Sequence, residues 1–335
     1  MTVSEAFLLS LGWSDFFQAG FDDKADFVPG RITGQGRGHY QAQVSSEQTL
    51  DATITSKFQD AAKDPASFPA IGDWVALRRG EGNTQATIHR ILSRVNTIQR
   101  KKSGAQASVQ MIAANVDNLF IVSSMNEDFD LPRLGRYIEL GREPACQTIL
   151  LLTKSDLSAN PAAYVDRFKA SFKGVEALVI SREDPDSMAV LQSYFTPGKT
   201  SLLLGSSGVG KSTLTNYLLG FDAQKTGAVT SEARGRHTTT ARTLRFTRWG
   251  GLVIDTPGMQ EVSAVASNKD LHNDFSDIKD LELLCKFTNC THKNEPGCAL
   301  LAALKNGTLR TERWQQYSGE TAQADPRRKK NKYSR

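Results

Sequence analysis

The pattern of apolar and polar positions divides the chain into stretches with different predicted secondary structure. Residues 1–30 are predicted to form a short helical lead, and its apolar positions are Phe7, Leu8, Leu11, Trp13, Phe16 and Phe17. From residue 31 to 110 apolar and polar residues partly alternate, which indicates half-buried strands. We expect strands over residues 31–44, 49–58, 73–79 and 86–100, separated by turns. Four or five short strands in this stretch favour a small closed barrel of the oligonucleotide-binding kind.

Beyond about residue 113 the pattern changes to strands that alternate with helices. Apolar runs predict strands over residues 116–124, 148–153 and 175–181, and another directly before residue 205. The segments between them predict helices over residues 131–142, 162–172 and 187–195. This alternation predicts a parallel, doubly wound sheet. From about residue 268 the chain turns helical and carries cysteine, and from about residue 325 it ends in a basic tail.

The loop after the strand that precedes residue 205 matches the phosphate-binding pattern G-x-x-x-x-G-K-[ST]. An apolar run enters the loop and a helix-compatible segment leaves it, which is the context that this pattern requires. Backbone N–H groups of residues 207–212 are expected to surround a β-phosphate, and Lys211 to bridge the β- and γ-phosphates as a catalytic residue. The residues assigned to the loop are Gly205, Ser206, Ser207, Gly208, Val209, Gly210, Lys211, Ser212 and Thr213.

A second motif follows the strand predicted over residues 148–153. Thr153, Lys154, Ser155 and Asp156 match [NT]-K-x-D, a pattern that reads guanine. The Asp156 carboxylate would accept hydrogen bonds from guanine N1–H and N2–H₂, whereas adenine would leave it unpaired. The stem of Lys154 would pack on the face of the base, and residues 179–181 are a weaker candidate for the last base-contacting loop.

A third motif, D-x-x-G, begins at Asp255 and ends at Gly258 after another apolar run. We expect Asp255 and Gly258 to sense magnesium and the γ-phosphate. Ordinary small GTPases place the phosphate loop first, D-x-x-G second and N-K-x-D last. In this chain the guanine-reading element comes first, and the order therefore predicts a circularly permuted GTPase.

The segment between the phosphate loop and D-x-x-G is expected to be a switch that responds to the γ-phosphate. It holds three successive threonines, residues 238–240, and the sequence leaves open which of them reaches magnesium; Thr239 is the candidate, together with Ser212 and with Asp255 acting partly through water. Met259 stands where many GTPases place the Gln that orients the attacking water. His237 is the nearby candidate for that catalytic role, and the alternative is an exposed switch histidine without a chemical role.

Cys285, Cys290, His292 and Cys298 form a compact C-x₄-C-x-H-x₅-C pattern. Three thiolates and one imidazole satisfy tetrahedral Zn²⁺ and leave no open position for chemistry, which predicts one structural zinc per chain. The alternative is a set of reduced cysteines in a small helical core. The remaining cysteine, Cys146, is expected to be a core residue.

Composition and charge narrow the function classes. The 335 residues are 39% hydrophobic and 23% charged, which is ordinary for a globular protein. The net charge of +5 is unevenly placed, with an acidic start and basic stretches over residues 31–110 and in the tail, which suggests a polyanionic partner or simply solvated surface. We find no apolar run near the ~20 residues of a membrane helix and no secretory signal. Four cysteines, three of them near a histidine, favour a reducing cytoplasm.

With these motifs placed, the chain resembles the RsgA (YjeQ) family of ribosome small-subunit-dependent GTPases. The resemblance rests on residues 68–75, 113–117 and 235–240, on the permuted motif order and on the zinc spacing. It implies an oligonucleotide-binding barrel, a permuted GTPase domain and a zinc domain, with slow GTP hydrolysis stimulated by the small subunit. It also places the family's proposed catalytic histidine at His237. One departure is Thr153, where the family more often has Asn, so we expect a lost brace between nucleotide loops and weaker affinity.

We therefore predict a multidomain α/β GTP hydrolase that acts in late maturation of the small ribosomal subunit. The expected parts are an extension (1–30), the barrel (31–110), the GTPase domain (111–267), the zinc domain (268–324) and the tail (325–335). Expected partners are GTP or GDP with Mg²⁺, the small subunit and its rRNA, for a cytoplasmic monomer away from membranes. Two alternatives stay open: an RNA-binding module with incidental hydrolysis, which Met259 in place of Gln leaves open, and an ATPase.

Overall fold

The structure is a computed structural model, and it describes most of the chain. The described residues are 3–21, 26–36, 38–62, 64–80, 84–101, 109–142, 145–221, 242–255, 276–287 and 290–309, together with Thr311, Trp314 and Tyr317. Within them, no helix has the length and apolar character needed to cross a bilayer.

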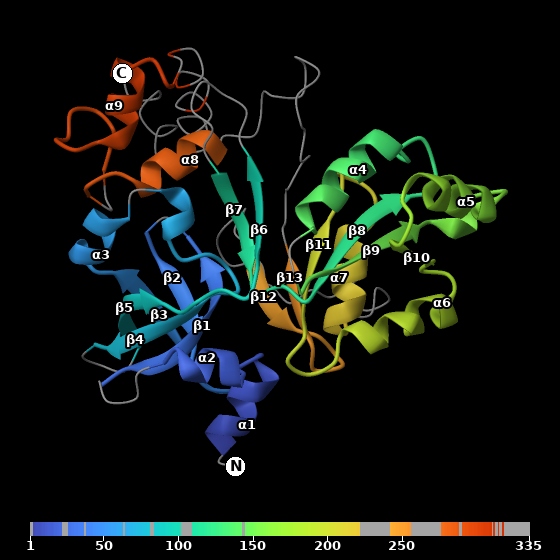
Figure 1. Ribbon diagram of the computed structural model, residues 1–335, viewed down its shortest axis with the longest axis horizontal. Coiled ribbons are helices and arrows are strands. Elements are labelled where there is room, and N and C mark those ends of the chain that lie inside the picture. The colour runs from blue at the N-terminus through green and yellow to red at the C-terminus, as the bar shows by residue number, and fades with distance from the viewer. Residues whose placement is uncertain are drawn as a thin grey trace, which may run out of the picture.

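Five strands near the N-terminus close into a barrel (Figure 1). They are β1 (Val28–Gln35), β2 (Tyr40–Gln43), β3 (Thr49–Ile54), β4 (Trp74–Arg79) and β5 (Gln85–Ile91). Their order is β1-β2-β3-β5-β4, and β4 pairs back to β1; only the β3–β5 pair is parallel. Alternate positions of β2 and β3 are buried and contribute Tyr40, Ala42, Leu50 and Ala52 to the barrel core. The predicted barrel is confirmed.

Several predicted strand limits in this region are wrong, because turns and caps interrupt them. The single strand expected over residues 31–44 is two strands, β1 and β2, joined by a turn in which Gly36 N donates to His39 O at 2.8 Å. β3 ends early because Thr55 caps the helix α3 (Ser56–Ala61), with its Oγ1 accepting from Phe58 N at 3.0 Å. A short 3₁₀ helix, Pro65–Ser67, follows.

The strand expected over residues 86–100 is also two elements. β5 stays in the barrel, whereas β6 (Thr97–Lys101) pairs only with β7 (Val109–Ala114) in a separate two-stranded sheet. This pair leads the chain from the barrel to the second domain.

The second domain is built on six strands in the order β10-β9-β8-β11-β13-β12. All neighbours are parallel except β12, which runs antiparallel to β13. The strands are β8 (Asn118–Ser124), β9 (Gln147–Thr153), β10 (Glu176–Val179), β11 (Thr200–Leu204), β12 (Thr243–Phe246) and β13 (Leu252–Asp255). The helices are α4 (Leu131–Leu140), α5 (Pro161–Ser171), α6 (Pro185–Ala189) and α7 (Lys211–Leu219), with 3₁₀ turns at Ser155–Leu157 and Val190–Tyr194.

Both faces of this sheet are covered by helices. Along β8, Leu119 and Ile121 enter a core shared with α4 and α5, whereas Phe120 and Val122 enter a core shared with α6 and α7. Since strand side chains alternate between faces, burial on both faces explains the continuous apolar runs in the sequence. The predicted doubly wound sheet is confirmed.

The barrel and the parallel sheet are joined through two strands. Gly34 of β1 pairs with Thr243 of β12, so the strands form one continuous eleven-stranded sheet (Figure 1). Arg242, just before β12, donates to the carbonyls of Met111 and Ile112 in β7 at 3.0 and 3.1 Å. The strand after the predicted switch is therefore bonded to the barrel side of the molecule.

The N-terminal helices α1 (Val3–Ser10) and α2 (Asp15–Ala19) close the junction between the two domains. Trp13 packs edge-on against Trp74 of β4, with ring centroids 4.7 Å apart. The buried Arg31 guanidinium donates to the carbonyls of Leu11, Gly72 and Asn115, which belong to the lead, the barrel and the start of the parallel-sheet domain. One side chain thus holds three parts of the chain together.

A C-terminal helical module contains α8 (Ser276–Leu283) and α9 (Ala299–Lys305) and lies beside α3 of the barrel (Figure 1). Gln59 Nε2 of α3 donates to the carbonyl of Cys285 at 2.6 Å. The module has a small core of its own, which includes Ile278, Leu300 and Leu309.

Candidate nucleotide and metal sites

The predicted nucleotide motifs meet at one edge of the parallel sheet. Strands β8, β9, β11 and β13 run parallel, so the residues after their carboxyl ends gather at the same edge. Thr153 ends β9, Leu204 ends β11 immediately before the phosphate loop, and Asp255 ends β13. The edge of a doubly wound sheet where these ends meet is the usual place for a ligand.

The backbone conformation and close packing of the phosphate loop depend on its glycines. A Cβ added to Gly205 would lie 2.2 Å from the carbonyl oxygen of Val122, so this position lets the loop approach β8 closely. Gly208 and Gly210 have φ values of 81° and 99°, in the left-handed region. The helix α7 begins directly afterwards at Lys211, which directs the N–H groups of its first turn towards the loop.

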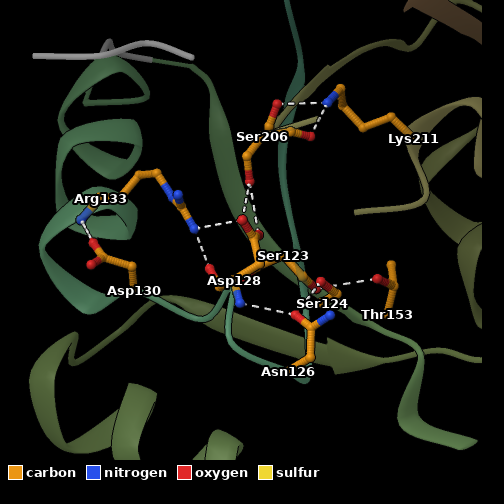
Figure 2. A network of polar contacts seen from close by, with 10 residues as sticks. Ser123, Ser124, Asn126, Asp128, Asp130, Arg133, Thr153, Ser206 and Lys211 are labelled. Atoms are coloured by element: carbon orange, nitrogen blue, oxygen red, sulfur yellow. Dashed lines mark hydrogen bonds and ion pairs between the residues drawn. The ribbon is translucent and has the colours of Figure 1, made fainter. Parts of the chain in front are cut away.

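Lys211 is folded onto the loop that carries it. Its Nζ donates to the carbonyls of Gly205, at 2.6 Å, and Ser206 (Figure 2). Burial lowers the pKa of Lys211, while the negative charges of Asp128 and Asp255 act in the opposite direction. A phosphate would offer this half-buried ammonium a charged acceptor in place of two neutral carbonyls.

Thr153 joins the guanine motif to the phosphate loop. Its Oγ1 donates to the carbonyl of Val209 at 2.6 Å. The Ser123 carbonyl lies 3.3 Å from the same oxygen, as Figure 2 shows. The expectation that a threonine here loses the brace between nucleotide loops is wrong, because the Thr153 hydroxyl is itself bonded to the phosphate loop. Residues far apart in the sequence are thereby fixed against one another.

The candidate base-reading residues lie next to each other. Asp156 is exposed after β9, and Ser181, which follows β10, donates its Oγ to Asp156 Oδ1 at 2.5 Å. Lys154 has a φ of 59°, a left-handed conformation that few residues other than glycine adopt. The structure therefore places residues 179–181, the weaker sequence candidate, beside the carboxylate that would read guanine.

Part of the predicted switch and magnesium site lies outside the described residues. His237, Thr239, Gly258 and Met259 are in this group, as is the tail over residues 325–335. The other magnesium candidates are described: Ser212 is exposed in the first turn of α7, as is Thr213 beside it, and Asp255 is half-buried.

The four predicted zinc ligands form one buried cluster. Their ligand atoms all lie within 4.8 Å of one another. His292 Nδ1 is 3.6 Å from Cys285 Sγ and 3.4 Å from Cys298 Sγ, and these two sulfurs are 3.9 Å apart. A tetrahedral ion with ~2.3 Å metal–sulfur bonds would hold its ligand atoms about 3.3–3.8 Å apart. These three distances lie within or close to that range, so the set of three thiols and one imidazole fits a zinc site after a small contraction.

The surroundings of the cluster favour a bound cation and orient the His292 imidazole. Burial raises the pKa of the Cys285 thiol, so a thiolate at this position calls for a bound cation. His292 Nε2, the nitrogen away from the sulfurs, lies 3.4 Å from Glu282 Oε1, which also accepts from Tyr317 Oη at 3.0 Å. A carboxylate in this place is typical of the partners that orient metal-binding histidines. The sequence analysis missed Glu282, which the C-x₄-C pattern does not include.

Fold and site together define the class. A phosphate loop follows β11, and the T-K-x-D motif, which comes earlier in the chain, is hydrogen-bonded to this loop. The strand that leads into the D-x-x-G motif ends at the same edge of the sheet. This is the arrangement of a circularly permuted GTPase, with a barrel before the nucleotide domain and a metal-binding module after it.

Comparison with known proteins agrees with this class. The family described as RsgA GTPase matches residues 91–265. The chain is 38% identical to the small ribosomal subunit biogenesis GTPase RsgA 2 of Vibrio vulnificus, spanning 95% of this chain and 88% of the relative. It is 39% identical to the protein of that name from Lactiplantibacillus plantarum, with the same coverage. The chain belongs to the RsgA GTPase family, and it is a GTP-hydrolysing enzyme.

A solved structure shares the fold. The crystal structure of YjeQ from Thermotoga maritima superposes with a TM-score of 0.52 and 20% sequence identity, and the match covers 89% of this chain and 98% of that one. The shared architecture supports the combination of barrel, permuted nucleotide domain and C-terminal module.

Proposed function

We propose that this protein hydrolyses GTP at the edge formed by β9, β11 and β13, and that hydrolysis serves late maturation of the small ribosomal subunit in the cytoplasm. The observation that carries the proposal is the Thr153–Val209 hydrogen bond, which fixes a guanine-reading motif against a phosphate loop. Two relatives that align with 95% of the chain are named small ribosomal subunit biogenesis GTPases, and this supports the proposed biological role.

The phosphate loop and α7 would hold the nucleotide phosphates. Backbone N–H groups from Ser207 to Ser212 would surround the β-phosphate, together with the positive end of the α7 dipole. Lys211 would exchange its carbonyl partners for the β- and γ-phosphates and stabilise the charge that develops during transfer.

Ser212 and Asp255 would hold magnesium, with Thr239 completing the site and Gly258 sensing the γ-phosphate. A hydroxyl and carboxylate oxygens are the donors that this ion prefers. Bound there, Mg²⁺ neutralises charge on the β- and γ-phosphates. His237 is the proposed group that positions the attacking water, because Met259 has no polar atom suited to that task.

The zinc cluster would bind one structural ion per chain, because its four ligands leave no coordination position open. The barrel, the zinc module and the basic tail would contact rRNA. The limits between the domains would lie near residues 30, 110, 267 and 324. The protein would act as a monomer on the subunit, with GTP and GDP as its small-molecule ligands.

Replacing Asp156 with Asn should relax guanine specificity. An amide can rotate to offer an N–H donor to the xanthine carbonyl, and it no longer accepts both guanine donors. We expect the ratio of GTP to XTP affinity to fall by about 10²-fold or more, in line with the loss of a charged hydrogen-bond partner to the base. Competition binding with the two nucleotides measures this ratio, and an unchanged ratio in Asp156→Asn would contradict the assignment. Asp186→Asn, on α6, is a matched control.

The biological proposal is tested by binding to purified small ribosomal subunits. A non-hydrolysable GTP analogue should give tighter binding than GDP, because the strand after the switch is bonded to the barrel through Gly34 and to β7 through Arg242. Binding should weaken steeply with salt, and deletion of residues 325–335 should reduce that slope. Equal affinity in both nucleotide states across a salt series would refute GTP-dependent binding.

A further inference from the structure

The loop between β8 and α4 brings a carboxylate to the phosphate loop. Ser206 Oγ lies 2.8 Å from both Oδ1 and Oδ2 of Asp128, so its hydroxyl donates to the carboxylate (Figure 2). Ser206 is buried and Asp128 is half-buried, which limits competition from water. None of the GTPase motifs includes Asp128.

Neighbouring residues hold Asp128 in place. Arg133 Nη2, in the first turn of α4, lies 2.8 Å from Asp128 Oδ1 and also donates to the Asp128 carbonyl. The Asp128 N–H donates to Asn126 Oδ1 at 3.0 Å, and that oxygen accepts from Ser124 Oγ at 2.8 Å (Figure 2). The carboxylate is therefore fixed, and its charge is offset by a guanidinium.

We propose that Asp128 is a positioning residue for the phosphate loop and that it acts through Ser206. Asp128 holds the first arm of the loop, while Thr153 holds the second arm at Val209. The Ser206 carbonyl also accepts from Lys211, so the anchored residue is in direct contact with the catalytic lysine. The inference rests on the proposed function, in which nucleotide phosphates bind this loop.

An anchor of this kind contributes to nucleotide binding rather than to the chemical step. In the proposed site the loop surrounds the β-phosphate, which GDP and GTP share. Loss of the Asp128–Ser206 bond should therefore weaken the binding of GDP and of GTP by the same factor. Uniform loss of binding raises KM without changing kcat. Hydrogen bonds to charged groups are among the stronger ones in proteins, and we expect about a tenfold effect.

The charge of Asp128 would have the opposite effect. A carboxylate beside a phosphate site repels the nucleotide, so if charge dominated, its removal would tighten binding. Asp128→Asn separates the two roles, because the amide oxygen still accepts from Ser206 while the charge is gone. Glu127→Ala is a matched control, since it removes an exposed acidic side chain from the adjacent position of the same loop.

The experiment measures the Kd of GDP and the kcat and KM of GTP hydrolysis in the full-length protein. Ser206→Ala and Asp128→Ala should each raise Kd and KM about tenfold at unchanged kcat. The double variant should lose no more nucleotide affinity than either single variant, because the two side chains are bonded to each other. Asp128→Asn should stay within about threefold of the wild type, and Glu127→Ala should match it.

An unchanged Kd in Ser206→Ala, or tighter GDP binding by Asp128→Asn, would overturn the inference. If Asp128→Ala does not fold, Ser206→Ala decides alone, since it deletes the same bond by removing one hydroxyl. A wild-type protein that binds no GDP would instead refute the proposed nucleotide site, so the two failures are distinguishable.

Discussion

Lys211→Ala should lower the rate of GTP hydrolysis by at least about 10²–10³-fold, the cost of removing one preorganised group that stabilises developing charge. In the structure Lys211 is half-buried, and its Nζ has only main-chain carbonyls of the loop as acceptors among its described hydrogen bonds. Its ammonium is therefore placed at the loop, ready to bind phosphate. Single-turnover hydrolysis of GTP measures the loss.

Lys173→Ala is a suitable control, because Lys173 is an exposed lysine that follows α5 in the same domain. It should hydrolyse GTP at the wild-type rate. Retention of wild-type turnover by Lys211→Ala would show that this loop is not the catalytic site.

Cys290→Ser should abolish zinc binding and unfold the module around α8 and α9. Structural zinc sites contribute about 10–16 kcal/mol to the folding of small domains, and this module has a small core of its own. Because Gln59 reaches the Cys285 carbonyl, unfolding also removes a contact with the barrel. GDP binding should be preserved, since the nucleotide edge lies on another domain. Metal analysis and hydrogen exchange over residues 276–309 measure the two effects.

Cys146→Ser is the matched control, because this cysteine lies before β9 and outside the cluster. It should keep one zinc per chain and normal exchange in the module. Less than one equivalent of metal in the wild-type protein would argue against the zinc site, and so would unchanged exchange in Cys290→Ser.

The parts of the molecule that sequence could predict are those with short-range signals. The loop from Gly205 to Lys211 is a fixed pattern between a strand and a helix, and Asp255 and Asp156 follow apolar runs. Parallel strands bring their carboxyl ends to one edge, so motifs that follow such strands are expected to meet there. The C-x₄-C-x-H-x₅-C spacing likewise contains every ligand of the cluster.

The parts that sequence could not predict depend on contacts between distant residues. Ser206 and Asp128 are 78 positions apart, and nothing local to either marks the bond between them. Glu282 lies outside the spacing of the metal ligands, so the motif does not indicate its contact with His292. At Thr153 the sequence suggested that a bond between the nucleotide loops is lost, because only the fold shows that the Thr153 hydroxyl reaches Val209. The strand expected over residues 31–44 is two strands, because the chain turns at Gly36 after β1 ends at Gln35 and before β2 begins at Tyr40.

The most direct test of the central claim is single-turnover GTP hydrolysis by the wild-type protein with and without purified small ribosomal subunits. If the nucleotide edge serves subunit maturation, the subunits should raise the rate by at least about tenfold, which corresponds to about 1.4 kcal/mol of the activation barrier. Lys211→Ala should show no such stimulation. Equal rates in the presence and absence of subunits would contradict the account and favour an RNA-binding module with incidental hydrolysis.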